Sequence, residues 1–144
     1  MAANNNPIFP NVLRSAAVAF TSTDGTTAKS IYAGATNGAR IDSIMITNTD
    51  TAAYTFQLFL NISATSYLIG SANIPASAGN TSAVQPVNLL PAIGAASGGP
   101  SPFVTDPYGN LVLYLGASVA LYGGVTGAIT AAKTMAVSVY GGEY

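Results

Sequence analysis

Few residues in this sequence have side chains that can do acid–base or nucleophilic chemistry. It contains no histidine and no cysteine, which removes the commonest general base, the thiol nucleophile and the usual zinc ligands. A serine nucleophile would need Lys29 or Lys133 as its base, and neither lies in a motif typical of that role. Paired-carboxylate chemistry would have to use Asp24, Asp42, Asp50, Asp106 and Glu143. We therefore expect no catalytic residues, no cofactor and no metal.

The contexts of the acidic residues favour structural roles. Asp24 and Asp50 both lie in turn contexts, where an aspartate commonly accepts hydrogen bonds from its own stretch of backbone. Asp42 follows Arg40 by two residues, and we expect it to pair with a cation on another strand. No run has the alternating oxygen ligands of a calcium loop. A hydrolase that uses Asp42 or Asp106 is kept as a third hypothesis.

The low charge of the chain bears on its partners. Only 6% of the residues are Asp, Glu, Lys or Arg, against about 25% in a typical domain. No charge occurs between Asp50 and Asp106, and the formal net charge is −1, so copies repel one another little. Four scattered cations argue against nucleic acid, whose binding scales with the phosphates neutralised. We interpret the surface as one that protein neighbours cover; the alternative is a chain kept in solution by Ser, Thr and Asn alone.

Membrane insertion and secretion find no support in the sequence. The most apolar stretch, residues 111–132, is interrupted by four glycines and several hydroxyl residues, unlike a spanning helix of about 20 apolar residues. The first residues, Met-Ala-Ala-Asn-Asn-Asn-Pro, have neither the basic nor the apolar region of a signal peptide. We expect synthesis in a cytoplasm and no membrane partner.

Short β-prone runs separated by turn residues extend from residue 12 onwards. Their period-two alternation, clearest where Phe56 and Leu58 alternate with Thr55 and Gln57, predicts strands. The predicted strands are Val12–Phe20, Lys29–Ala33, Arg40–Thr49, Ala53–Asn61, Ser66–Ile74, Val84–Leu90, Asn110–Leu115, Ser118–Tyr122 and Thr134–Tyr140. We predict an all-β, single-domain β-sandwich of jelly-roll type, with helices of at most one turn.

The connections carry further predictions. Residues 48–51 are expected to form a hairpin turn between two neighbouring strands, and Gly123-Gly124 to mark another turn. The Gly- and Pro-rich segment 91–102 is predicted to be a long loop. Residues 1–11 are predicted to be an extended arm ahead of the 12–144 domain. Candidate contacts to other subunits are Ile8 and Phe9 in the arm, and Glu143 and Tyr144 as exposed residues at the end of the chain.

Four short runs in this chain resemble small structural proteins of tailed bacteriophages. The resemblance covers roughly residues 20–144. Over this range the chain is similar in particular to capsid decoration (cement) proteins and related head or tail accessory proteins. The runs are Thr21-Ser-Thr-Asp-Gly-Thr-Thr, Gly38-Ala-Arg-Ile-Asp-Ser-Ile-Met-Ile, Phe56-Gln-Leu-Phe-Leu and Val137-Ser-Val-Tyr-Gly-Gly-Glu-Tyr. The resemblance implies a jelly-roll-like domain, a homotrimer, seated on the outer shell at local symmetry axes.

Two functional hypotheses of different class follow. The first is a virion structural protein, a capsid cement that bridges subunits of the major capsid protein, located on the capsid surface after synthesis in the host cytoplasm. The second is a carbohydrate- or receptor-binding module of a phage fibre or tail, since jelly rolls also serve as lectins. The oligomeric mass and a glycan array would discriminate between them.

Overall fold

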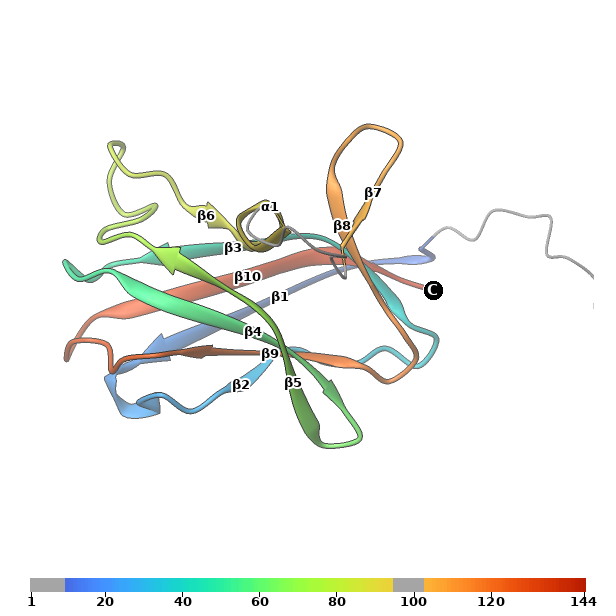
Figure 1. Cartoon of the computed structure of the whole chain (residues 1–144), viewed down its shortest axis with the longest axis horizontal. Helices are drawn as coiled ribbons and strands as arrows, with labels where there is room; N and C mark the ends of the chain where they lie inside the picture. Colours follow the sequence, from blue (N-terminus) through green and yellow to red (C-terminus); the bar gives the residue numbers. More distant parts are fainter. Residues whose placement is uncertain (1–9, 95–102) are drawn as a thin grey trace, which may run out of the picture.

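Two antiparallel sheets make up most of the part of the chain that the computed structural model describes, residues 10–94 and 103–144. The first sheet contains, in spatial order, β1 (Val12–Thr21), β10 (Thr134–Glu143), β3 (Ala39–Asn48), β8 (Leu111–Leu115) and β7 (Val104–Thr105), with β6 (Val87–Asn88) also paired to β3. The second contains β2 (Lys29–Tyr32), β9 (Ala120–Val125), β4 (Tyr54–Ile62) and β5 (Thr65–Ile74). Figure 1 shows the two layers, and the predicted all-β sandwich is confirmed.

The strands pair in a nested order. β4 pairs with β5, β3 with β8, β2 with β9 and β1 with β10, so that strands early and late in the sequence lie side by side. Each of these pairs is enclosed in the sequence by the next one. Two further pairings, β10 with β3 and β9 with β4, join the four pairs into two sheets.

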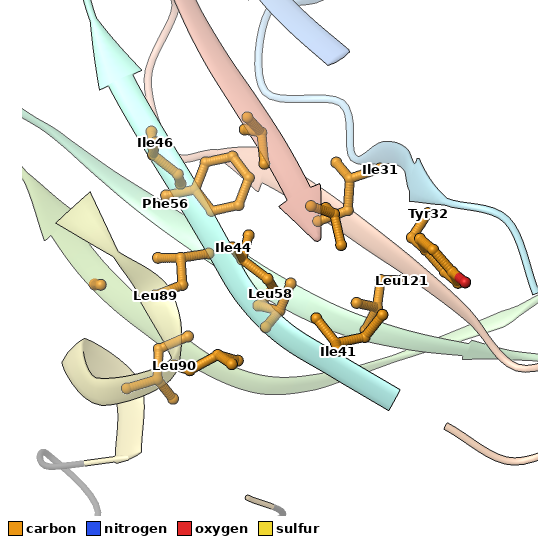
Figure 2. Close-up of a cluster of buried hydrophobic side chains, with 14 of the residues drawn as sticks. Ile31, Tyr32, Ile41, Ile44, Ile46, Phe56, Leu58, Leu89, Leu90 and Leu121 are labelled. Carbon is orange, nitrogen blue, oxygen red and sulfur yellow. The ribbon is translucent and has the colours of Figure 1, made fainter. Parts of the chain in front are cut away.

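The core lies between the sheets and follows from the alternation of each strand. Met135, Val137 and Val139 alternate along β10 and are all fully buried, and so are Ile44 and Ile46 of β3. Side chains of the second sheet meet them from the other side. Figure 2 shows a cluster of these buried side chains and labels Ile31, Tyr32, Ile41, Ile44, Ile46, Phe56, Leu58, Leu89, Leu90 and Leu121.

The hairpin between β4 and β5 has the tightest connection of the nested set. Ile62 pairs with Thr65, which leaves two residues in the turn. Both of them, Ser63 and Ala64, have positive φ, the conformation that matches the right-handed twist of two-residue hairpins. Neither is the Gly, Asn or Asp that usually signals such a turn, so nothing in the sequence predicted it here.

The predicted hairpin at residues 48–51 is wrong. β3 belongs to the first sheet and β4 to the second, so this segment carries the chain across the sandwich. The buried amide of Asn48 fixes the crossing, because its Nδ2 donates to the carbonyls of Ala52 (2.9 Å) and Pro75 (3.0 Å).

The turn predicted at Gly123-Gly124 is also wrong, because both residues lie within β9. Gly123 is packed against a core ring: a Cβ there would collide with Cζ of Phe56. A strand glycine of this kind marks a close approach of a neighbour, not a turn.

The segments at residues 84–102 differ from their predictions in two ways. Only Val87–Asn88 is a strand, and α1 (Leu89–Gly94) follows at once. The Asn88 side chain starts this helix by accepting from the backbone N–H of Leu90 (3.2 Å), and Pro91 is tolerated because the first turn needs no donor there. The predicted loop 91–102 is therefore helical at its beginning, and residues 95–102 lie outside the described residues.

Candidate protein-binding surface

The outer face of the second sheet has no charged side chains. Because Phe56 and Leu58 point into the core, the alternate residues of β4 and their cross-strand partners point outward. We define the charge-free face by these outward residues: Ser30, Thr55, Gln57, Phe59, Asn61, Ser66, Leu68, Ser71, Asn73, Ala120 and Tyr122.

Lys29 is the one charged residue in the four strands of this sheet, and it points away from the charge-free face. Its Nζ lies 2.8 Å from Asp24 Oδ1, 4.7 Å from the centre of the Phe20 ring and 2.6 Å from the carbonyl oxygen of Ala19 on β1. The Lys29 ammonium therefore binds residues at the corner between the two sheets, and the outer face stays neutral.

The β4–β5 hairpin carries exposed apolar side chains on both of its sides. Ile62, Tyr67 and Leu68 expose 43%, 55% and 55% of their surface. In Figure 1 the end of this hairpin extends beyond the rest of the sandwich. Ile62 and Tyr67 lie on one side of the hairpin and Leu68 on the other, so both sides of its tip are apolar. Clustered exposed apolar residues mark binding sites more often than single ones do.

These three hairpin residues were missed by the sequence analysis. The run Tyr67-Leu68-Ile69 places three large apolar residues in a row, which breaks the alternation. The pairing of β5 with β4 shifts register opposite Leu58 and Phe59, so Ile69 is the extra residue of a β-bulge. The broken alternation, together with the charge-free stretch between Asp50 and Asp106, is the signal that could have located this surface.

The charged side chains gather elsewhere and largely neutralise one another. Arg14 Nε lies 3.0 Å from Glu143 Oε1 at the end of the first sheet. Arg40 lies between two carboxylates, with its Nε 2.7 Å from Asp42 and its Nη2 3.4 Å from Asp106. Pairing of this kind leaves little net field on the surface.

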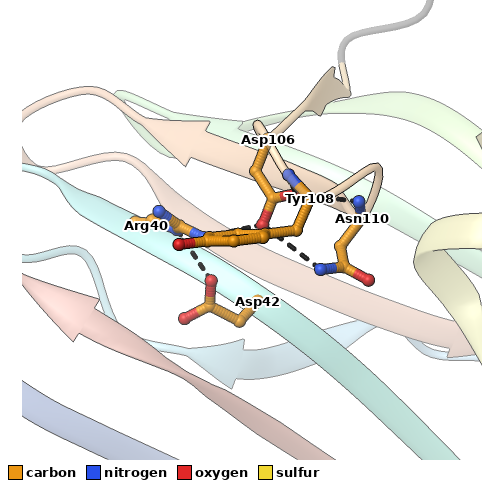
Figure 3. A network of polar contacts seen from close by, with 5 residues as sticks. All are labelled: Arg40, Asp42, Asp106, Tyr108 and Asn110. Atoms are coloured by element: carbon orange, nitrogen blue, oxygen red, sulfur yellow. Dashed lines mark hydrogen bonds and ion pairs between the residues drawn. The ribbon is translucent and has the colours of Figure 1, made fainter.

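Arg40 joins the two carboxylates of Asp42 and Asp106 in the polar network of Figure 3. Asp42 pairs with this cation on its own strand, not with one from another strand as predicted. Arg40 and Asp42 lie two residues apart in β3, so their side chains share one side of the strand. A register shift between β3 and β10 leaves Asp42 as the extra residue of a β-bulge. The structure thus brings both carboxylates of the hydrolase hypothesis, Asp42 and Asp106, to one guanidinium.

Asp106 stabilises the turn between β7 and β8. Its carboxylate accepts from the backbone N–H groups of Tyr108 (2.9 Å) and Asn110 (2.9 Å), an arrangement typical of aspartate in turns. The hydrogen bonds from Asn110 are the main reason that the pKa of Asp106 lies below its usual range. A carboxyl held ionised in this way is a poor general acid, and its neighbours give it a structural role.

The predicted contact residues at the chain ends have different outcomes. Ile8 and Phe9 lie outside the described residues. Glu143 and Tyr144 were predicted to be exposed, but both are half-buried. Glu143 accepts a hydrogen bond from the hydroxyl of Tyr32 (3.0 Å). The pKa of Tyr32 is raised to about 12, mainly because its side chain is buried and also because the Glu143 carboxylate is close to it. Tyr144 donates its N–H to the carbonyl of Gly38, so Glu143 and Tyr144 both make contacts within the domain.

Two features of the described residues bear on ligands and membranes. In residues 10–94 and 103–144, no three His, Cys, Asp or Glu side chains come together in a way that could hold a metal ion. In the same part of the chain, no helix has the length and hydropathy needed to cross a bilayer.

Comparisons with protein-family models, with curated proteins and with solved structures find no match to this chain.

Proposed function

We propose that this chain is a virion structural protein, a capsid decoration protein that binds the outer surface of a phage shell and bridges neighbouring capsid subunits. The observation that carries the proposal is the charge-free face with its apolar hairpin. A face without ions loses no ionic hydration when protein covers it, and an apolar tip gains from leaving water. The phage-protein resemblance of the four sequence runs supports the same function.

We also assign the sandwich to the jelly-roll class. Without the two-residue strands β6 and β7, each sheet has four strands, and the nested pairing gives the orders β1-β10-β3-β8 and β2-β9-β4-β5. A jelly roll is an eight-stranded double sheet of this kind, formed by rolling up one long hairpin. A jelly roll is compatible with a shell-bound protein. The fold alone does not distinguish this function from sugar binding, because the same class contains viral capsid domains and lectins.

The test of shell binding uses a single charge placed on the hairpin. Leu68→Asp puts a carboxylate in the centre of the proposed contact, where its desolvation would oppose binding. We expect co-sedimentation with shells that lack the protein to weaken by about tenfold or more, the effect of losing an interface residue worth at least 1.4 kcal/mol. The control is Ala131→Asp, the same charge at an exposed position in the β9–β10 connection, which should sediment like the unaltered chain.

Either of two results would contradict the proposal: equal sedimentation of the Leu68→Asp and Ala131→Asp variants, or failure of the unaltered chain to bind shells. Circular dichroism of both variants checks that the added carboxylate has not unfolded the hairpin.

Carbohydrate binding is the second candidate, and a different surface favours it. Tyr108 is 90% exposed at the tip of the β7–β8 turn, beside a surface hollow of ≈ 490 Å³. The hollow is lined by Arg40, Asp42, Asp106 and Asn110, which offer both donors and acceptors to sugar hydroxyls (Figure 3). The flat ring can cover the apolar face of a sugar, so ring and hollow together have the components of a glycan site.

A glycan array separates this candidate from the first. Saturable binding that Tyr108→Ala abolishes, and that Leu68→Asp leaves unchanged, would establish the sugar site. An array without signal would exclude it and leave the shell-binding proposal untouched.

A further inference from the structure

β1 is the outermost strand of the first sheet, and its other side has no strand beside it among the described residues. Its ten residues pair with β10 without a register shift and contain no proline and no lysine. Native edge strands are usually shortened, bulged or charged, since a long regular edge is a template for another strand.

The other edges of the sandwich have such protection within the described residues. β7 has two residues and β2 has four. β5 is as long as β1, but its pairing shifts register, and its Gly70 lies against Ile93 of α1. β1 is therefore the edge with the longest regular stretch.

One end of the β1 edge is closed by a side chain. Lys29 Nζ donates to the carbonyl oxygen of Ala19 at 2.6 Å, so this carbonyl points away from β10. Because carbonyls and N–H groups alternate between the two sides of a strand, Leu13, Ser15 and Ala17 direct their backbone groups to the same outer edge. The stretch Leu13–Ala17 is thus left open for pairing.

The open stretch also has room for side chains on both sides of the sheet. A hollow of ≈ 220 Å³ is lined by Arg14, Ser15 and Ala16 together with residues 32–36. A second, of ≈ 380 Å³, is lined by Leu13, Arg14 and Ser15 together with Tyr140 on the outer face. A strand added at a sheet edge gains affinity from its backbone and places alternate side chains in such hollows.

We propose that β1 pairs with β1 of a second copy of this chain, antiparallel and about a two-fold axis at Ser15, so that two first sheets join into one. In this register Leu13, which is 90% exposed, lies opposite the small exposed Ala17 of the other copy, and the reverse contact follows by symmetry. Arg14 lies opposite Ala16, so no like charges lie directly opposite each other.

A second copy fits this edge better than other occupants because the segment is self-complementary. It sets a large residue against a small one in both directions, its single charge already pairs with Glu143, and the net charge of −1 gives little repulsion between copies. The contact uses β1 and not the β4–β5 hairpin, so it does not depend on the proposed shell binding.

Two proline variants test the contact. Ser15→Pro removes an N–H that points to the open edge and leaves the bonds to β10 in place, so we expect the dissociation constant of self-association to rise by about tenfold or more. Ala19→Pro makes the same change beyond the paired stretch and should behave like the unaltered chain. Light scattering after size exclusion should give twice 14.4 kDa for the unaltered chain and for Ala19→Pro, and 14.4 kDa for Ser15→Pro.

A charge pair tests the position of the axis. Ser15→Lys and Ser15→Glu each place like charges opposite each other and should each run at 14.4 kDa, whereas their mixture should form a heterodimer. A monomeric unaltered chain, a trimer that Ser15→Pro does not change, or a mixture that stays monomeric would each overturn the proposal. Leu68→Asp should leave the mass unchanged, so failure here is distinguishable from failure of shell binding.

Discussion

Phe56→Ala should lower the free energy of unfolding by about 3–5 kcal/mol, the range for removing a buried aromatic ring. Phe56 is fully buried and packs edge-on against Phe20, with ring centroids 5.4 Å apart and an interplanar angle of 89°. The glycine at position 123 exists in this strand because the ring occupies the space of a side chain there. Truncation would leave a cavity that backbone on both sides cannot easily fill. Denaturant unfolding followed by tyrosine fluorescence measures the change.

Phe59→Ala is the matched control for this prediction. The same ring is removed from the same strand, but Phe59 points to the charge-free face and is only half-buried. We expect a loss of about 1 kcal/mol or less, because little packing is lost when a ring at the surface is removed. If the two variants were equally stable, the assignment of inner and outer faces of β4 would be wrong.

Replacing Asp50 should have the other large effect on stability, and this effect should depend on pH. Asp50 is 1% exposed, and its carboxylate accepts from the hydroxyl of Tyr54 (2.7 Å) and the backbone N–H of Thr130 (2.8 Å). These hydrogen bonds, that of Tyr54 first, hold the pKa of Asp50 well below its ordinary value. The ionised carboxylate joins the crossing between β3 and β4 to the connection before β10, so Asp50→Ala leaves buried donors without an acceptor.

The sign of the pH dependence follows from the lowered pKa. The unfolded chain takes up a proton at a higher pH than the folded chain does, so the contribution of Asp50 is complete above about pH 5 and is lost as the pH falls. The free energy of unfolding of the unaltered chain should therefore decrease on acidification more steeply than that of Asp50→Ala. Asp42→Asn, which changes an exposed carboxylate in a surface ion pair, should alter stability little at neutral pH. Parallel curves for Asp50→Ala and the unaltered chain would contradict the assignment.

Much of the fold could be predicted from local pattern, because alternation reports which residues face a core. The strands at 12–20 and 134–140 came from that signal, and the alternate residues Met135, Val137 and Val139 of the second are all buried. Sheet membership could not be predicted in this way, since the 48–51 segment has the composition of a hairpin turn whether its strands pair or separate. One of the two buried hydrogen bonds that fix the crossing, from the Asn48 amide to the carbonyl of Pro75, joins residues far apart in the chain.

The sequence suggested the kind of surface that we propose for binding, but not its position in the fold. The absence of charge between Asp50 and Asp106 pointed to a surface covered by protein, and both the charge-free face and the hairpin tip come from that stretch or from strands beside it. The hairpin itself was overlooked because its turn, Ser63-Ala64, has no glycine or asparagine. Glu143 was predicted to be exposed and is instead half-buried, because its carboxylate meets Arg14 and Tyr32, whose proximity depends on the nested strand order.

The nested strand order also has a consequence for how the chain becomes folded during translation. Its innermost pair, β4 and β5, can close as soon as residue 74 leaves the ribosome, whereas Val12 must wait for Glu143, its partner at the far end of the chain. Closing so large a loop is entropically unfavourable and slow. A nascent chain therefore carries β1 without its partner strand until residues 134–143 have been made, and a premature stop before residue 134 would remove β10 altogether.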